Sequence, residues 1–368
     1  MRFKSLEVGS NCPVFNLDGP LLSKKNRPLA QPLDPALQAQ WQSGLALLQQ
    51  GRLADAERIF SDILQRAPNH FGALNMLGVI ALQGRACERA VQLFSKAISI
   101  NPNVPQSHSN RSIALGALKR FKEALLSSDK AIALKPDFAE AHYNRGNALQ
   151  ELGRFDEALS SYDRAIALAA ATGAARHPAF AEVHFNRGNV LAALQRRDEA
   201  LASLDKSLAL NPGSAEAHSN RGNVLQELGR LEEALASYDR AIALKSEHAP
   251  AWSNRGLALA ALERPSEALA SYDKAIALKP DHAEAHSNRG IVLKELGRLP
   301  EALASCERAI ALRPDHAEAH SNRGAVLKEL ARLEEALASY DRAVALKPDL
   351  ADGTALHLRM ALCQWADF

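Results

Sequence analysis

AEAHSNRG, at residues 215–222, occurs again at residues 283–290 and 317–324, and close variants stand at residues 139–146 and 181–188. The small residue that ends this stretch recurs every 34 residues. It appears as Gly44, Gly78, Ser112 and Gly146 and, after one eight-residue insertion, as Gly188, Gly222, Gly256, Gly290 and Gly324. A fixed period of this length indicates an array of similar structural repeats. Nine repeats fill residues 37–350, and positions 1–34 are counted here from the first residue of each repeat.

Three further positions follow the same period. Position 20 is alanine in every repeat, position 24 is bulky or aromatic in most repeats, and a proline closes most repeats at position 32. Glycine after an apolar run, as in Leu-Gly-Arg at residues 228–230, favours a left-handed helix stop between two helices. Proline cannot continue the second helix, so it separates one repeat from the next. Small residues at positions 8 and 20 let the two helices approach closely.

This pattern resembles the tetratricopeptide repeat (TPR), which folds as helix, turn and helix in 34 residues. The resemblance implies an all-α, right-handed superhelical solenoid of tandem helix-turn-helix units, in which each repeat buries its apolar face against its neighbours. Residues 1–34 are expected to be a flexible N-terminal arm, and residues 351–368 a C-terminal helix or the start of a following domain. The insertion near residues 169–180 is expected to prolong the second helix of repeat four until Thr172 and Gly173.

Composition limits the other function classes. Hydrophobic residues make up 47% of the chain but aromatic residues 5%, which is typical of alanine- and leucine-rich helix packing. The net charge of +2 gives no electrostatic case for nucleic-acid binding. No stretch approaches the roughly 20 apolar residues of a membrane span. The four cysteines share no motif spacing, and the polar N-terminus does not resemble a signal peptide, so a cytoplasmic location is expected.

No phosphate-binding loop, nucleophile motif or cofactor motif stands out, so we expect no catalytic residues and no cofactor. The segment DHAEAH spaces His282 and His286 as helical metal ligands could be spaced, and His316 and His320 likewise. Position 4 carries these second histidines in most repeats but Trp252 in repeat seven. A position that accepts tryptophan is a packing position, so we expect core or interface histidines and no metal site.

The polar face of the first helix is the candidate functional site. Positions 2, 6, 9 and 13 share one helical face. Position 6 is asparagine in seven successive repeats: Asn110, Asn144, Asn186, Asn220, Asn254, Asn288 and Asn322. In TPR arrays the first helices line a concave groove, where these amides would form a ladder. An amide offers a donor and an acceptor and so complements a peptide unit. The alternative is that copied repeats inherit an asparagine that has no use.

Charged residues form a second periodic set. Position 7 is arginine in repeats three to nine, and position 25 is acidic in the same repeats, whereas repeats one and two lack both. A half-buried arginine needs a carboxylate partner. We therefore expect Arg255 to pair with Asp273 of its own repeat or with Asp239 of the preceding one, although copying from one ancestral repeat could also produce the pattern.

The last residues resemble the boundary between repeats and catalytic region in O-linked N-acetylglucosaminyl transferases. Cys363, Trp365, Asp367 and Phe368 match that family's stretch, and its repeats carry an asparagine ladder that holds acceptor protein. Three functions remain open: an adaptor that binds extended peptides, the substrate-selecting part of such a transferase without its catalytic domain, and a purely architectural scaffold. The expected partners are proteins or peptides, and the apolar residues 351–368 could support a homodimer or a contact with an additional domain.

Overall fold

The computed structural model describes residues 35–173, 175 and 177–348, so the predicted N-terminal arm and C-terminal segment lie outside the described residues. The chain forms two compact units, Met1–Asn211 and Pro212–Phe368. The described helices of the N-terminal unit are α1 (Pro35–Gln49), α2 (Leu53–Arg66), α3 (Phe71–Gln83), α4 (Cys87–Ile100), α5 (Pro105–Ala117), α6 (Phe121–Leu134), α7 (Ala139–Glu151), α8 (Phe155–Ala171), α9 (Phe180–Ala193) and α10 (Arg197–Leu210). Those of the C-terminal unit are α11 (Ala215–Glu227), α12 (Leu231–Leu244), α13 (Ala249–Ala261), α14 (Pro265–Leu278), α15 (Ala283–Glu295), α16 (Leu299–Leu312), α17 (Ala317–Glu329) and α18 (Leu333–Leu346).

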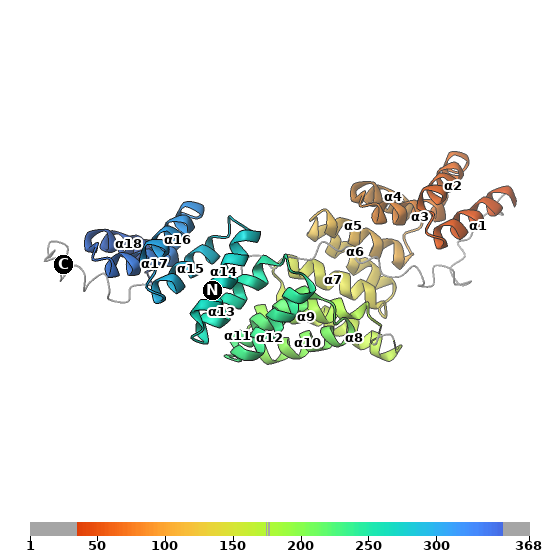
Figure 1. Ribbon diagram of the computed structural model, residues 1–368. Coiled ribbons are helices and arrows are strands. Elements are labelled where there is room, and N and C mark those ends of the chain that lie inside the picture. Colours follow the sequence, from red (N-terminus) through yellow and green to blue (C-terminus); the bar gives the residue numbers. More distant parts are fainter. Residues whose placement is uncertain (1–34, 174, 176, 349–368) are drawn as a thin grey trace. The chain divides into compact units, whose positions relative to one another are not determined.

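Each odd-numbered helix packs against the even-numbered helix that follows it, and within each unit that helix packs against the first helix of the next repeat (Figure 1). The predicted all-α solenoid of tandem helix-turn-helix repeats is thereby confirmed. Second helices end just before the proline, as α14 does at Leu278 ahead of Pro280, because proline cannot donate the next helical hydrogen bond.

The turn between the two helices has the same geometry in every repeat. Position 15 takes a positive φ, for example 74° at Gly229, whose N–H donates to the carbonyl of Gln226 over 3.0 Å. The next residue, Arg230, donates to Leu225 over 2.9 Å and so closes the end of α11. Non-glycine residues take the same conformation, with φ of 57–61°, at Arg85, Lys119, Gln195, Glu263 and Ala331. The repeat therefore imposes the left-handed turn even on residues that disfavour it.

The close approach of the two helices occurs where position 8 meets position 24. A Cβ atom built on Gly222 would lie 2.5 Å from Cε1 of the fully buried Tyr238, which is too close for any side chain. In repeat eight Cys306 occupies the place of the aromatic ring, with its Sγ 2.5 Å from such an atom on Gly290. Cys306 therefore fills the bulky position, as the sequence predicts.

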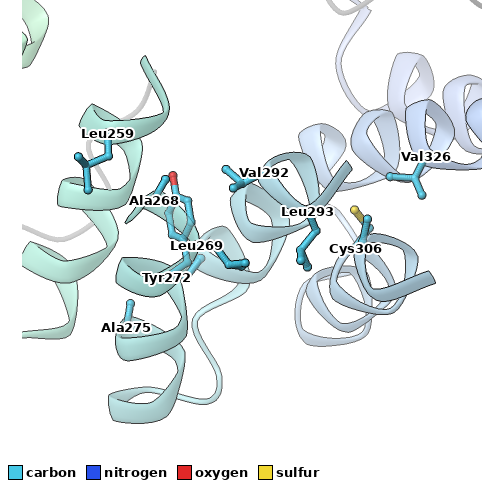
Figure 2. Packing of buried hydrophobic residues seen from close by; sticks show 11 residues of the cluster. Leu259, Ala268, Leu269, Tyr272, Ala275, Val292, Leu293, Cys306 and Val326 are labelled. Atoms are coloured by element: carbon cyan, nitrogen blue, oxygen red, sulfur yellow. The ribbon is translucent and has the colours of Figure 1, made fainter. Parts of the chain in front are cut away.

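The cores of successive repeats are continuous. In the C-terminal unit one buried cluster runs from Leu259 on α13 through Tyr272 on α14 and Leu293 on α15 to Cys306 on α16 and Val326 on α17 (Figure 2). Side chains from three repeats thus share one apolar cluster. A single hairpin buries too little surface to be stable alone, and stacking supplies the rest.

The insertion lengthens one helix, as predicted. α8 has 17 residues, whereas α6 and α10 have 14. It ends at Ala171, Thr172 caps it, and Gly173 has a φ of 76°. The next helix, α9, begins at Phe180.

Candidate functional site

The first helices form the inner layer of each unit. Within the N-terminal unit α5 contacts α7 and α7 contacts α9, and within the C-terminal unit α11, α13, α15 and α17 contact one another in succession. Consecutive second helices make at most marginal contact in the described parts of the chain. Because the first helices approach one another more closely, each unit curves toward them. The periodic asparagines are all on these inner helices.

Two asparagines donate to position 5 of the preceding repeat. Nδ2 of Asn144 lies 3.0 Å from Oγ of Ser109, and Nδ2 of Asn322 lies 2.9 Å from Oγ of Ser287. Asn144 is buried and Asn322 is half-buried. In both bonds the amide nitrogen is the donor, so the carbonyl oxygen of the side chain is not consumed.

Two others donate to position 9 of the preceding repeat. Nδ2 of Asn254 lies 2.8 Å from Oδ1 of Asn223, and Nδ2 of Asn186 lies 3.1 Å from Oδ1 of Asn147. Asn186 also donates to the hydroxyl of Tyr143 over 3.2 Å. These bonds link neighbouring first helices and fix the rotamer of each amide.

The remaining asparagines occupy the same helical position with varied surroundings. Asn110 accepts from Nε2 of Gln106 over 3.0 Å. Asn220 lies at the same position on α11 and is half-buried, as are Asn110 and Asn288. The seven predicted residues therefore lie on the inner helices, and six of them remain partly accessible to solvent.

The hydroxyl groups of buried tyrosines on the second helices bond to polar side chains of the first helices. The hydroxyl of Tyr238 lies 2.8 Å from Oδ1 of Asn223 and 3.1 Å from Oε1 of Gln226. Tyr162 makes the equivalent bonds two repeats earlier, to positions 9 and 12 of repeat four. Burial raises the pKa of Tyr238 and Tyr162, so both hydroxyls stay protonated and act as donors. Position 12 was missed by the sequence analysis, although its glutamine in repeats four and six shares the helix with the asparagines.

The position-4 side chain closes the junction between repeats. Nε2 of His108 lies 2.8 Å from the carbonyl oxygen of Pro102, and the same bond joins His142 to Pro136 over 3.0 Å. His218, His286 and His320 repeat it. In repeat seven Nε1 of Trp252 donates over 2.9 Å to the carbonyl of Ser246, which stands in place of the proline. The prediction of interface histidines is confirmed, because these side chains bond the end of the preceding repeat. In repeat seven, tryptophan makes the same bond in place of histidine.

The same bond is not made by the histidine that follows the insertion, although Pro178 stands six residues before it. His184 follows the insertion, and its Nδ1 is buried without a hydrogen-bond partner among the described residues. Burial, together with the charges of Lys206 and Arg187, lowers the pKa of His184 to about 4. The ring is therefore neutral at physiological pH.

The arginines pair with the preceding repeat. Nε of Arg255 lies 2.7 Å from Oδ1 of Asp239, and its Nη1 donates over 2.7 Å to Oγ of Ser271 in its own repeat. The same two bonds occur at Arg145, Arg289 and Arg323, and Arg187 pairs with Asp163 over 2.6 Å. The prediction that Arg255 pairs with a position-25 carboxylate is confirmed. Of the two expected partners, Asp239 of the preceding repeat makes the bond. Because Asp239 is 51% exposed, the pair orders the junction more than it stabilises it.

Neither a metal cluster nor a spanning helix was found in the described ranges. No group of three or more histidine, cysteine or acidic residues there is placed to hold a metal ion. No described helix is long and apolar enough to cross a membrane.

Several solved structures are similar to this chain. The structure of YrrB, described as a TPR protein with an unusual peptide-binding site, is 29% identical, with a TM-score of 0.45, and the match covers 52% of this chain and 95% of that one. The Cut9–Hcn1 hetero-tetramer of the APC/C is 17% identical with a TM-score of 0.55, and the match covers 75% of this chain and 52% of that one. MamA is 22% identical, with a TM-score of 0.40, and covers 45% of this chain and 96% of its own. The likeness to Cut9–Hcn1 shows a shared fold, and this chain spans about half of that chain's length.

No curated protein matches the chain. A family profile described as tetratricopeptide repeat matches residues 42–106, 185–251, 219–283, 253–315 and 287–351, which together are more than half of the chain. Two further profiles, described as tetratricopeptide repeat and TPR repeat, match residues 137–212 and 114–153. With the helix pairs, the left-handed turns and the shared cores described above, these matches show that the chain belongs to the tetratricopeptide repeat family.

Proposed function

We propose that this protein is a non-catalytic interaction scaffold that binds extended polypeptide segments along its inner helices. The proposed binding residues are Asn110, Asn144, Asn186, Asn220, Asn254, Asn288 and Asn322. The observation that carries the proposal is the common direction of the hydrogen bonds at Asn144, Asn186, Asn254 and Asn322. Each amide nitrogen donates backward into the preceding repeat.

This arrangement favours binding of a peptide backbone. A backward-donating amide has a fixed orientation, so little side-chain entropy is lost when a ligand arrives. Its carbonyl oxygen accepts an N–H group, and an extended chain presents N–H groups at regular intervals. Backbone recognition of this kind depends little on the side chains of the ligand.

The test uses reduced, carboxymethylated α-lactalbumin as a permanently unfolded polypeptide probe. Replacing Asn220, Asn254 and Asn288 together with alanine removes three amides, each worth about 0.5–1.5 kcal/mol, so affinity should fall roughly tenfold to a thousandfold. Asn103→Ala, in the exposed turn before α5, is the matched control and should bind as the unmodified protein does. Circular dichroism should show equal helix content in all variants. Unchanged affinity of the triple variant would contradict the proposal.

A second candidate is the substrate-selecting TPR part of an O-linked N-acetylglucosaminyl transferase-like enzyme. It is supported by the sequence resemblance at Cys363, Trp365, Asp367 and Phe368, which lie outside the described residues. The coding sequence after Phe368 tests it. A sugar-nucleotide-binding domain in the same frame is expected, and a stop codon there would rule this candidate out.

A cytoplasmic location belongs to the same proposal. It is supported by the free thiols of Cys87 and Cys306, the two cysteines among the described residues. Fractionation of the source cells tests it.

We also propose that a second copy or a further domain attaches at residues 351–368. Measuring mass in solution before and after deletion of these residues tests this proposal.

A further inference from the structure

The first arginine at position 7 lacks the carboxylate partner seen at later junctions between repeats. Five of the later arginines pair with position 25 of the preceding repeat. The equivalent partner of the first arginine of the series, Arg111, would lie in repeat two. Position 25 of repeat two is Ser95, on α4, where the later repeats carry a carboxylate. Arg111 therefore lacks the acidic residue that its counterparts have.

The missing carboxylate has a structural consequence. At Arg145, Nε bonds the carboxylate of Asp129 and Nη1 bonds Oγ of Ser161. At Arg111 the equivalent Nε is buried without a hydrogen-bond partner among the described residues, and so is Oγ of Ser127, the counterpart of Ser161. Both bonds are absent together at this junction, whereas four of the later arginines make both. A buried, unpaired donor of this kind costs about 1–3 kcal/mol.

The carboxylate of Glu123 does not fill this place. Both oxygens of Glu123 accept from Arg120, over 2.7 and 2.8 Å. At the equivalent junctions the carboxylate at position 25 is open to solvent. Asp129, Asp163 and Asp273 are 47–51% exposed there. We therefore expect an external group to approach this place over α4, where the buried Nε of Arg111 has to turn outward to meet it.

We propose that Arg111 and Ser127 form a carboxylate-binding site at the junction of repeats two and three, and that an aspartate or glutamate side chain of a bound polypeptide occupies it. The occupant takes the place that Asp129 takes beside Arg145, and Arg111 then turns to donate to Ser127. A single guanidinium beside a neutral hydroxyl suits one negative charge. The site does not depend on the asparagine ladder.

The full-length protein, labelled with ¹⁵N in its arginine side chains, provides the test. The Nε–H signal of Arg111 is identified by its loss in Arg111→Leu, which reproduces Leu77 of repeat two. The probes are the peptide acetyl-Ala-Glu-Ala-amide and its glutamine analogue. The glutamate peptide should shift the Arg111 signal saturably, with an affinity at least about tenfold above that of the analogue. The signal of Arg255, which already has its carboxylate, should not move.

Two variants of Ser95 distinguish the proposed site from general charge effects. Ser95→Asp supplies the carboxylate from within the chain, so it should raise the melting temperature and abolish the response to the peptide. Ser95→Asn is the neutral control and should keep the response. Equal shifts with both peptides, no shift at all, or a full response in Ser95→Asp would overturn the proposal. A shift with sodium acetate but not with the glutamate peptide would also overturn it, because the occupant would then not be a polypeptide.

Discussion

Replacing Gly222 with serine tests how the two helices of a repeat approach each other. A Cβ atom at this position would lie 2.5 Å from Cε1 and 2.8 Å from Cδ1 of Tyr238. The ring cannot move away easily, since it is fully buried and its hydroxyl is bonded to Asn223 and Gln226. Overpacking of this kind costs about 1–3 kcal/mol, and better helix propensity than glycine returns roughly 0.5 kcal/mol. Gly222→Ser should therefore lower stability by about 1–2 kcal/mol.

Repeat three has a small residue at both of these positions. It has Ser112 at position 8 and Ser128 at position 24, and the two hydroxyl oxygens lie 2.6 Å apart. Tyr238→Ser alone should cost about 3–5 kcal/mol, because it leaves a large cavity. Adding Gly222→Ser to that variant should cost nothing further and restore some stability through the serine pair. The expected coupling between the two substitutions is about 1–3 kcal/mol.

Urea denaturation followed by circular dichroism measures the global effect, and amide hydrogen exchange in α11 and α12 measures the local one. The local measurement is needed because repeat arrays can open one repeat at a time. The control is Gly116→Ser, since no atom beyond the adjoining backbone of its own helix and its chain neighbours lies within 4 Å of a Cβ built there. It should not lower stability. Strictly additive effects at Gly222 and Tyr238 would refute the reasoning.

Three further results are expected. Ala331→Gly should raise stability by about 0.5–1 kcal/mol in urea denaturation, because alanine is held at a φ of 57°. Gly229→Ala at the equivalent turn should lower stability. A change of the same sign in both variants would contradict this expectation. The folded state holds the pKa of His184 at about 4, below its ordinary value of 6.5, so the unfolded chain binds more protons between these values and stability should fall as pH drops from 6.5 toward 4. His184→Phe should remove this part of the pH dependence, and an unchanged slope would argue against it. Burial raises the pKa of Cys306 to about 12, so at pH 8 a thiol reagent should modify Cys87 and leave Cys306 intact unless the chain is unfolded.

The candidate site was predictable in its position but not in its contacts. Periodicity places Asn144 and Asn254 on one face of the first helix, and in the structure both lie on first helices and bond the first helix of the preceding repeat. Their partners could not be read from the period, because one asparagine donates to Ser109 at position 5 and the other to Asn223 at position 9. Which partner is used depends on the side chains that the preceding helix presents, and this varies between repeats.

The sequence by itself determined the architecture of this protein. The 34-residue period, glycine opposite a bulky residue and a left-handed turn at position 15 are local or nearest-neighbour constraints, so they are visible in the amino-acid order. The tertiary structure decided which carboxylate each arginine reaches. Asp273 lies in the same repeat as Arg255, but the stacking of α12 on α13 brings Asp239 to it instead. Pairing across a junction joins side chains from two repeats, and for that reason the structure was needed to show that Arg111 has no acidic partner in repeat two.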